Sequence, residues 1–496
     1  MVIVCALLIS TIAAAIPSAT IVRAQEDVPR FKETRCRFQE PEDTKITCGD
    51  LYVYEDRTDP DNSNVIRLHV AVIKARSRTA YGDPIIYLEG GPGGETLDSL
   101  SFSYPQYFTK LAQKRDLIFF DQRGVGLSRP ALDCREIEFS RVDILRRAVT
   151  TKQAEEEYNL ALQACRERLQ EDGINLAAYN SAENASDVAE LLQTLGYSEW
   201  NLYGISYGTR LALTVMRDHP DGVRSVVLDS TYPPNASLYT DIPRSADRAF
   251  TALFDGCSTE PRCNRAYPKL ESAFFKLMDD LNEDPPSVTV RYQGKRYPVV
   301  VTGARVMDEM FSLMYSTSVI PYIPSLIWEM KDGNFERMAE LILEDNIGTR
   351  SSVSTGMYWS VQCSEEVPFS SETELVNADA LFPEQMGVFG GGDAYSICQF
   401  WDVTHAPEIE NEAVVSDIPT LVLAGEYDPI TPPSYGVLAA KTLRNSFYFE
   451  FPGIGHGASV SGICPSSIMQ QFLENPGRKP SSACIRRMEG PDFVIE

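Results

Sequence analysis

The chain has 496 residues, of which 43% are hydrophobic and 23% charged, a composition typical of a folded globular protein. Its formal net charge of −25 at pH 7 argues against a nucleic-acid partner, because a polyphosphate backbone would be repelled. The length is more than one ordinary core fills, so we expect a large domain that carries an insertion.

The first predicted element is an export signal. Residues 2–22 are almost wholly apolar, and Val22 and Ala24 place short side chains at the two positions that a signal peptidase reads. We therefore expect residues 1–24 to be a signal peptide, and the mature protein to be secreted or periplasmic. Because no Lys or Arg precedes the apolar run, the alternative is a segment that stays uncleaved as an anchor. No later run is long and apolar enough to span a bilayer, so no stable membrane association is expected after removal.

The cysteines agree with export. Of the eleven, Cys5 would leave with the signal, and an even set of ten in an exported chain predicts disulfides rather than buried free thiols. Metal binding is not expected, because no Cys-x-x-Cys occurs and the chain has only four histidines. The simplest of the many pairings joins sequence neighbours: Cys36–Cys48, Cys134–Cys165, Cys257–Cys263, Cys363–Cys398 and Cys464–Cys484.

From about residue 67 the chain alternates short apolar runs with helical patterns, which is typical of βαβ units around a mostly parallel sheet. Two of the runs are continuously apolar, as expected for strands that are buried on both faces. The predicted strands are residues 67–74, 84–88, 116–120, 200–203 and 225–228, with a helix at 210–218.

The pattern then changes to mainly amphipathic helix, and strands return near the C-terminus. The clearest helical stretches are residues 247–254, 269–280 and 325–343, with a hairpin expected at 288–301 and later strands at 419–424 and 447–451. The sequence predicts an α/β fold whose mostly parallel sheet is flanked by helices and interrupted by a large, mainly helical inserted cap. The expected divisions are a core at 25–231, a cap at 232–415 and the rest of the core at 416–496.

A nucleophile is predicted at the end of the strand 200–203. The run Gly-Ile-Ser-Tyr-Gly at residues 204–208 is a weak motif alone, but here a strand enters it and a helix leaves it. A serine at such a sharp turn needs small neighbours two residues away, and glycines occupy both positions. We therefore expect Ser206 to be a catalytic nucleophile at a helix N-terminus, where the helix dipole favours negative charge. An ordinary glycine-flanked turn is the alternative.

Acyl transfer needs two backbone N–H groups that hold the oxyanion. One is expected from Tyr207, the residue after the nucleophile. The second is expected from the glycine-rich loop at residues 89–94, where Pro92 has no N–H to donate. We assign it to Gly91, with Gly90 as the alternative. The loop lacks the spacing of a phosphate-binding loop.

Hydrolases with this turn carry serine, acid and histidine in that chain order. Of the histidines that follow Ser206, only His456 lies in a loop directly after a predicted strand of the sheet, the strand 447–451. Asp428 follows the preceding strand, 419–424, and is predicted to hold the imidazole tautomer and stabilise the imidazolium. Glu426 is the local alternative for the acid.

With these motifs in place, the sequence resembles the prolyl-aminopeptidase family of α/β-hydrolases over about residues 30–490. The resemblance is carried by Gly-Gly-Pro-Gly at 90–93, Asp-Gln-Arg-Gly-Val-Gly-Leu-Ser at 121–128, the serine turn, Asp428, and Gly-His-Gly at 455–457. The long cysteine-containing insertion and the C-terminal cysteines look most like the secreted tripeptidyl-aminopeptidase-like branch. The resemblance implies an α/β-hydrolase fold and removal of N-terminal residues or short peptides through an acyl-enzyme, with no metal or organic cofactor.

Two positions bear on the substrate. Prolyl aminopeptidases usually carry His before Gly-Gly-Pro-Gly, whereas Glu89 stands here, which disfavours strict proline specificity and agrees better with the secreted branch. An exopeptidase also needs carboxylates for the free α-ammonium, since a buried cation requires a partner. Glu365 and Glu366 are the candidates, with a solvated surface pair as the alternative.

The expected function is therefore that of a secreted serine aminopeptidase acting on peptides or small acyl substrates. A carboxylesterase or other small-molecule hydrolase is the first alternative, because one triad serves esters and amides and a fold does not fix the substrate. A non-catalytic binding protein on the same fold is the second, and the intact set of motifs argues against it.

Overall fold

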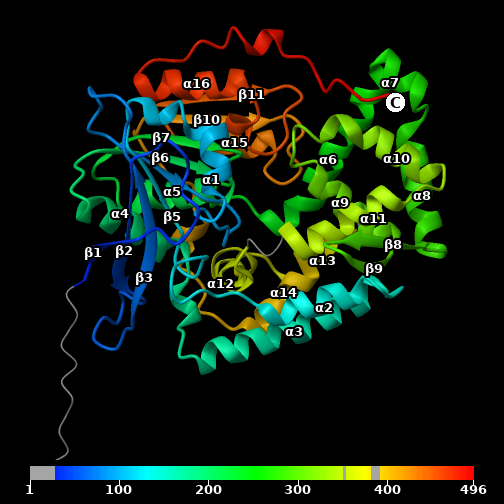
Figure 1. Ribbon diagram of the computed structural model, residues 1–496, viewed down its shortest axis with the longest axis horizontal. Coiled ribbons are helices and arrows are strands. Elements are labelled where there is room, and N and C mark those ends of the chain that lie inside the picture. The colour runs from blue at the N-terminus through cyan, green and yellow to red at the C-terminus, as the bar shows by residue number, and fades with distance from the viewer. Residues whose placement is uncertain (1–27, 350–352, 381–390, 496) are drawn as a thin grey trace, which may run out of the picture.

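The computed structural model describes residues 28–349, 353–380 and 391–495. Its main sheet has nine strands in the order β1-β2-β3-β5-β4-β6-β7-β10-β11, with helices on both faces (Figure 1). The pairings from β5 to β11 are all parallel, whereas β1, β2 and β3 form an antiparallel edge. The predicted α/β fold with a mostly parallel sheet is confirmed. The predicted signal at 1–24 lies outside the described residues.

The strands match the apolar runs of the sequence, with the antiparallel edge as an addition. The predicted strands correspond to β3 (Val65–Ile73), β4 (Ile85–Leu88), β5 (Leu117–Phe120), β6 (Trp200–Ile205), β7 (Val223–Asp229), β10 (Thr420–Gly425) and β11 (Ser446–Phe451). Two strands that the sequence did not reveal, β1 (Arg30–Thr34) and β2 (Ile46–Tyr54), extend the sheet beyond β3.

Alternate residues of the central strands feed two separate cores. Val226 and Leu228 of β7 pack beneath α4 (Ser181–Thr194) and α5 (Tyr207–Asp218), whereas Val227 packs on the opposite face. That opposite face is covered by α1 (Leu100–Ser103), the π-helix Tyr104–Phe108 and α16 (Ile463–Glu474). Burial on both faces explains why these strands read as continuous apolar runs.

The segment between β7 and β10 is mainly helical and lies beside the sheet (Figure 1). Side chains from residues 246–343 form a core of their own. The elements of the segment are α6 (Leu238–Thr259), α7 (Pro261–Ala266), α8 (Leu270–Glu283), β8 (Ser287–Tyr292), β9 (Lys295–Val300), α9 (Gly303–Leu313), α10 (Ile323–Lys331), α11 (Glu336–Glu344), α12 (Thr355–Glu365), α13 (Glu372–Ala380) and α14 (Gly391–Trp401). The boundaries at 232 and 415 stay a prediction.

The prediction of a single helix at residues 325–343 was wrong. Residues 325–343 form two helices, α10 and α11, because the chain turns at Gly333, whose φ of +88° is outside the helical region. The hairpin expected at 288–301 is present as β8 and β9.

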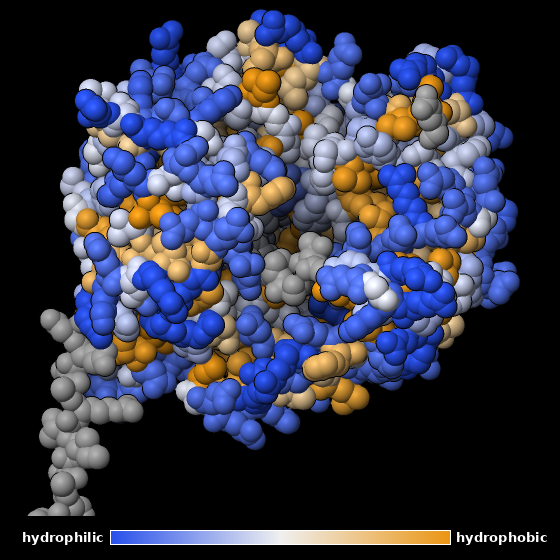
Figure 2. Space-filling model, in the orientation of Figure 1, coloured by the Kyte–Doolittle hydropathy of each residue, from blue (hydrophilic) through white to orange (hydrophobic). Residues whose placement is uncertain are grey.

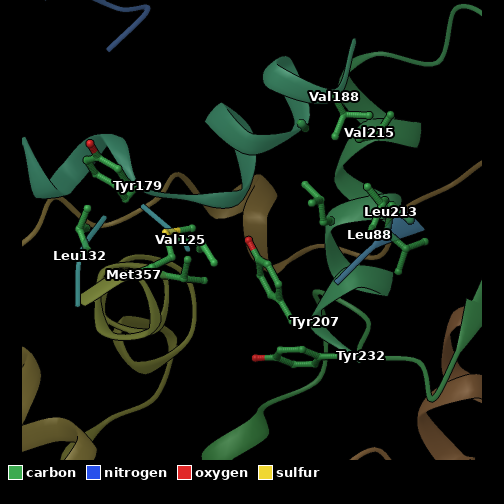
Figure 3. Close-up of a cluster of buried hydrophobic side chains, with 14 of the residues drawn as sticks. Leu88, Val125, Leu132, Tyr179, Val188, Tyr207, Leu213, Val215, Tyr232 and Met357 are labelled. Atoms are coloured by element: carbon green, nitrogen blue, oxygen red, sulfur yellow. The ribbon is translucent and has the colours of Figure 1, made fainter. Parts of the chain in front are cut away.

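The second half of the insertion packs on the sheet-bearing part of the molecule rather than on the insertion's own core. In Figure 3, Met357 of α12 lies near Val125 and Leu132. Two helices from the first half of the chain, α2 (Arg135–Ile144) and α3 (Thr151–Glu171), in turn contact inserted elements: α3 touches α14, and Leu145 after α2 belongs to the insertion's core. The two parts are therefore interleaved.

Five disulfides join the ten cysteines, and their pairing is the one expected from sequence neighbours. Within the described residues, no helix combines the length and apolarity that crossing a membrane requires. The C-terminal tail leaves α16 and crosses to the inserted helices (Figure 1), where Phe493 is buried in their core and the Val494 N–H donates to the Pro321 carbonyl at 3.0 Å.

Candidate active site

Ser206 lies at the turn between β6 and α5, in a backbone conformation that a non-glycine residue rarely adopts. Its φ of 58° and ψ of −128° are typical of strain kept at a functional position. A Cβ at Gly204 would clash with the Gly208 carbonyl, and a Cβ at Gly208 would clash with the carbonyl of Leu88 on β4. Both glycines of the motif are thus required by close packing of the backbone.

His456 and Asp428 meet in a direct hydrogen bond. The distance between His456 Nδ1 and Asp428 Oδ2 is 2.8 Å, and Asp428 is fully buried. The other oxygen of Asp428, Oδ1, accepts the N–H groups of Ile430 at 3.1 Å and Thr431 at 2.9 Å, while the Thr431 hydroxyl donates to Oδ2 at 2.8 Å. Glu426 instead accepts the Gly453 N–H at 2.8 Å. The structure therefore brings Asp428, and not Glu426, to the imidazole.

The surroundings of the pair shift both pKa values in the direction that keeps the pair charged. Burial alone would raise the pKa of Asp428, but His456 and the Thr431 hydrogen bonds outweigh it, and the pKa lies below its ordinary value. Burial likewise lowers the pKa of His456, whereas the carboxylates of Asp428, Asp229 and Glu89 raise it further than burial lowers it. The imidazolium that forms when a base takes a proton is therefore stabilised here.

The inserted segment holds the histidine loop and the acid loop from one side. The His456 N–H donates to the Tyr315 carbonyl at 2.9 Å, and the Tyr315 ring lies 4.9 Å from the imidazole between centroids. Arg248 of α6 donates to the carbonyls of Glu426 and Asp428. These inserted residues carry no motif, so sequence reasoning missed them. Figure 2 shows one face of the molecule, which is hollowed between the sheet-bearing part and the inserted helices.

The glycine-rich loop lies directly against the serine. A Cβ at Gly90 would be 3.0 Å from the Ser206 Cβ and 3.5 Å from its Oγ. The Gly90 N–H is already engaged, since it donates to Glu89 Oε1 at 2.9 Å. The N–H groups of Gly91 and Tyr207 have no acceptor among the described residues. This leaves Gly91 rather than Gly90 as the geometric candidate for the second oxyanion donor.

The remaining motif residues shape this loop or the fold around it. The carboxylate of Asp121 accepts the N–H groups of Thr96 at 2.9 Å and Leu97 at 3.0 Å, just beyond the glycines. Gln122 donates to the Glu89 carbonyl at 3.0 Å. Arg123 is fully buried and pairs with Asp187 of α4 at 2.8 Å. The Asp-Gln-Arg motif is thus structural support for the strand ends.

Glu365 and Glu366, the predicted ammonium-binding pair, are buried with 1% and 6% of their surface exposed. Arg210 of α5 lies between them, 3.4 Å from Glu365 Oε2 and 3.0 Å from Glu366 Oε2. Burial raises the pKa of Glu365 to about 7 although Arg210 opposes the shift. The Tyr232 hydroxyl also donates to Glu366, and Figure 3 shows this ring beside Tyr207. An ammonium-binding role stays a prediction, and it would require the contacts with Arg210 to open, so the geometry favours a structural role.

The other three histidines lie elsewhere. His69 is fully buried and bonded to Asp50 at 2.9 Å, His219 lies 3.1 Å from the Ser186 hydroxyl, and His405 is exposed. Each has a local environment that explains it without reference to Ser206.

The fold and this constellation of side chains define a serine hydrolase of the α/β-hydrolase class. The sequence profile of the alpha/beta hydrolase fold family matches residues 83–462, which is more than half of the chain. The chain therefore belongs to the α/β-hydrolase fold family.

Among curated proteins, the chain is 25% identical to the serine protease Hip1 of Mycobacterium tuberculosis, over 91% of this chain and 90% of that protein. It is also 25% identical to carboxylesterase B of the same species, over 94% of this chain and 91% of that protein. A tripeptidyl aminopeptidase of Streptomyces coelicolor is 30% identical over 196 residues, which are 38% of this chain and 36% of that protein. These relatives include both a peptidase and an esterase by name.

Proposed function

We propose that the protein is an exported serine aminopeptidase that releases N-terminal residues or short peptides through an acyl-enzyme. The observation that carries the proposal is the bond between His456 and buried Asp428, together with the strained turn at Ser206. The names of relatives that align over most of the chain, a serine protease, and over part of it, a tripeptidyl aminopeptidase, support peptide substrates. Export is supported by the apolar N-terminal run and the five disulfides, which persist in oxidising compartments.

In the proposed reaction, Ser206 Oγ attacks the scissile carbonyl while His456 takes its proton. Asp428 keeps the imidazole in the tautomer whose Nε2 is free to accept that proton, and it stabilises the imidazolium. The N–H groups of Gly91 and Tyr207 hold the oxyanion. His456 then gives the proton to the leaving amine. Water next attacks the ester carbonyl of the acyl-enzyme while His456 takes its proton, and His456 returns that proton to Ser206 Oγ as the acyl group leaves.

The second candidate function is that of a carboxylesterase, because carboxylesterase B aligns over 94% of the chain. The triad alone does not decide between the two, since it serves both kinds of acyl transfer. Glu89 in place of a histidine argues against strict specificity for proline.

Two measurements test the proposal. Labelling by a fluorophosphonate probe should occur at Ser206 and disappear in Ser206→Ala, and equal behaviour of the two proteins would refute a serine hydrolase. Peptidyl-anilides with free and with blocked amino termini should then be compared with simple acyl esters. An aminopeptidase requires a clear preference for the free amine, whereas hydrolysis of esters alone would favour the second candidate.

A further inference from the structure

Asp229 stands between the two strands that lead to the nucleophile and to the acid. It is the last residue of β7, in register with Ile205 of β6 on one side and Leu423 of β10 on the other. Its main-chain carbonyl accepts the Ser206 N–H at 3.1 Å. The nucleophile turn is thus held by the backbone of Asp229.

The side chain of the same residue holds the histidine loop. Asp229 Oδ1 accepts the Ala458 N–H at 2.9 Å, and Oδ2 accepts the Ser459 N–H at 2.7 Å and its hydroxyl as well. The neighbouring Ser230 hydroxyl accepts the Gly457 N–H at 2.8 Å. Three consecutive N–H groups directly after His456 are therefore accepted by two consecutive residues, Asp229 at the end of β7 and Ser230 directly after it.

A carboxylate at this position needs an explanation, because Asp229 is fully buried and forms no ion pair with Lys or Arg in the described part of the chain. Burial raises its pKa to about 6, although the hydrogen bonds from Ser459 and Ala458 oppose the shift. A neutral side chain would avoid this penalty, but it would not offer two acceptor oxygens to three donors. We therefore attribute the carboxylate of Asp229 to the positions that its two oxygens impose on the main-chain N–H groups after His456.

We propose that Asp229 is a positioning residue that fixes His456 relative to Ser206 by binding both loops at once. The proposal rests on the proposed function, because it assumes that Ser206 and His456 react together. The alternative is a purely structural role, in which the carboxylate only satisfies the N–H groups at the start of the short helix Ala458–Val460.

The test is Asp229→Asn, which keeps the shape of the side chain but turns one acceptor oxygen into a donor that faces an N–H group. The main-chain bond to Ser206 is unaffected, so only the histidine loop loses its anchor. We expect kcat and the rate of fluorophosphonate labelling, both per folded molecule, to fall about 10- to 100-fold with little change in KM. Since His456 also loses one of the three carboxylates that face it, Asp428, Asp229 and Glu89, the acid limb of the pH profile should move to lower pH.

Asp83→Asn is the matched control. Asp83 is a buried carboxylate just before β4, at the N-terminal ends of the parallel strands and thus opposite to Asp229, and it is bonded to Asn201 and Arg115 at 2.9 Å each. It should lower the melting temperature and leave the labelling rate per folded molecule unchanged. The same outcome for Asp229→Asn would overturn the positioning role.

Ser459→Ala decides the matter if Asp229→Asn does not fold. It removes one hydroxyl donor to Asp229 and leaves the main-chain donors, so we expect a labelling rate about fivefold lower. An unchanged rate would overturn the proposal. If the wild-type protein is not labelled at Ser206 at all, the proposed function fails and this proposal fails with it. Wild-type labelling that Asp229→Asn leaves unchanged refutes the positioning role alone.

Discussion

Replacing Asp428 by Asn changes only the side of the carboxyl group that faces the imidazole. The Oδ1 atom accepts two main-chain N–H groups, from Ile430 and Thr431, so an amide will keep its oxygen at that position. Its NH2 group then occupies the place of Oδ2, 2.8 Å from His456 Nδ1. Because a donor now faces Nδ1, that nitrogen must become the acceptor and the ring proton must move to Nε2. The nitrogen that should accept the Ser206 proton is then blocked.

The expected loss is about 10⁴-fold in kcat, the scale found when a triad aspartate is replaced by its amide and the wrong tautomer results. The rate should be measured with a p-nitrophenyl acyl ester and with a fluorophosphonate probe, so that the result does not depend on the peptide substrate. Glu426→Gln is the matched control, because Glu426 lies two residues away on the same loop and bonds to Gly453 rather than to His456. It should leave kcat nearly unchanged.

Two results would contradict the reasoning. One is an Asp428→Asn protein that keeps more than about a tenth of its activity, since a blocked Nε2 leaves no base for Ser206. The other is a large loss in Glu426→Gln with the fold intact, which would make Glu426 the acid and the observed bond to Asp428 incidental.

Three further outcomes follow from other parts of the structure. Arg210→Met leaves two buried glutamates without their cation and should lower the free energy of unfolding, measured by urea titration, by about 3–5 kcal/mol. An unchanged free energy of unfolding would mean that the glutamates are neutral and need no cation. Neighbouring carboxylates raise the pKa of His456, and a base must be neutral to act, so kcat/KM should rise with pH through an apparent pKa above that of an ordinary histidine; an acid limb below the ordinary histidine value would contradict the assignment of the base. Phe493→Ala removes a ring buried in the core of the inserted helices and should destabilise the protein by up to about 3–5 kcal/mol in thermal or urea unfolding. Phe102→Ala is the control and should have little effect, because 66% of Phe102 is exposed. Equal effects of the two substitutions would show that the C-terminal tail does not stabilise the insertion.

Much of the sheet was predictable from the sequence, because the apolar pattern of a buried strand is contained in a few consecutive residues. Strands buried on both faces must be continuously apolar, so β4 to β7, β10 and β11 are visible as short runs between turns. The edge strands β1 and β2 were not recognised, since polar residues interrupt their apolar pattern. Helix 325–343 was predicted as one piece because amphipathic periodicity continues across Gly333, whereas the backbone turns there.

The sequence by itself determined the small residues that a serine turn needs, the order of serine, acid and histidine, and an even set of ten cysteines after the apolar N-terminal run. These features depend on residue type and on order along the chain, so they can be read without coordinates. Only the tertiary structure decided which carboxylate meets His456, which glycine N–H stays free for an oxyanion, and that Glu365 and Glu366 lie against Arg210. It alone showed the hydrogen bonds that Asp229, Tyr315 and Arg248 form with the loops of Ser206, Asp428 and His456, because contacts between segments far apart in the sequence arise only when the chain is folded.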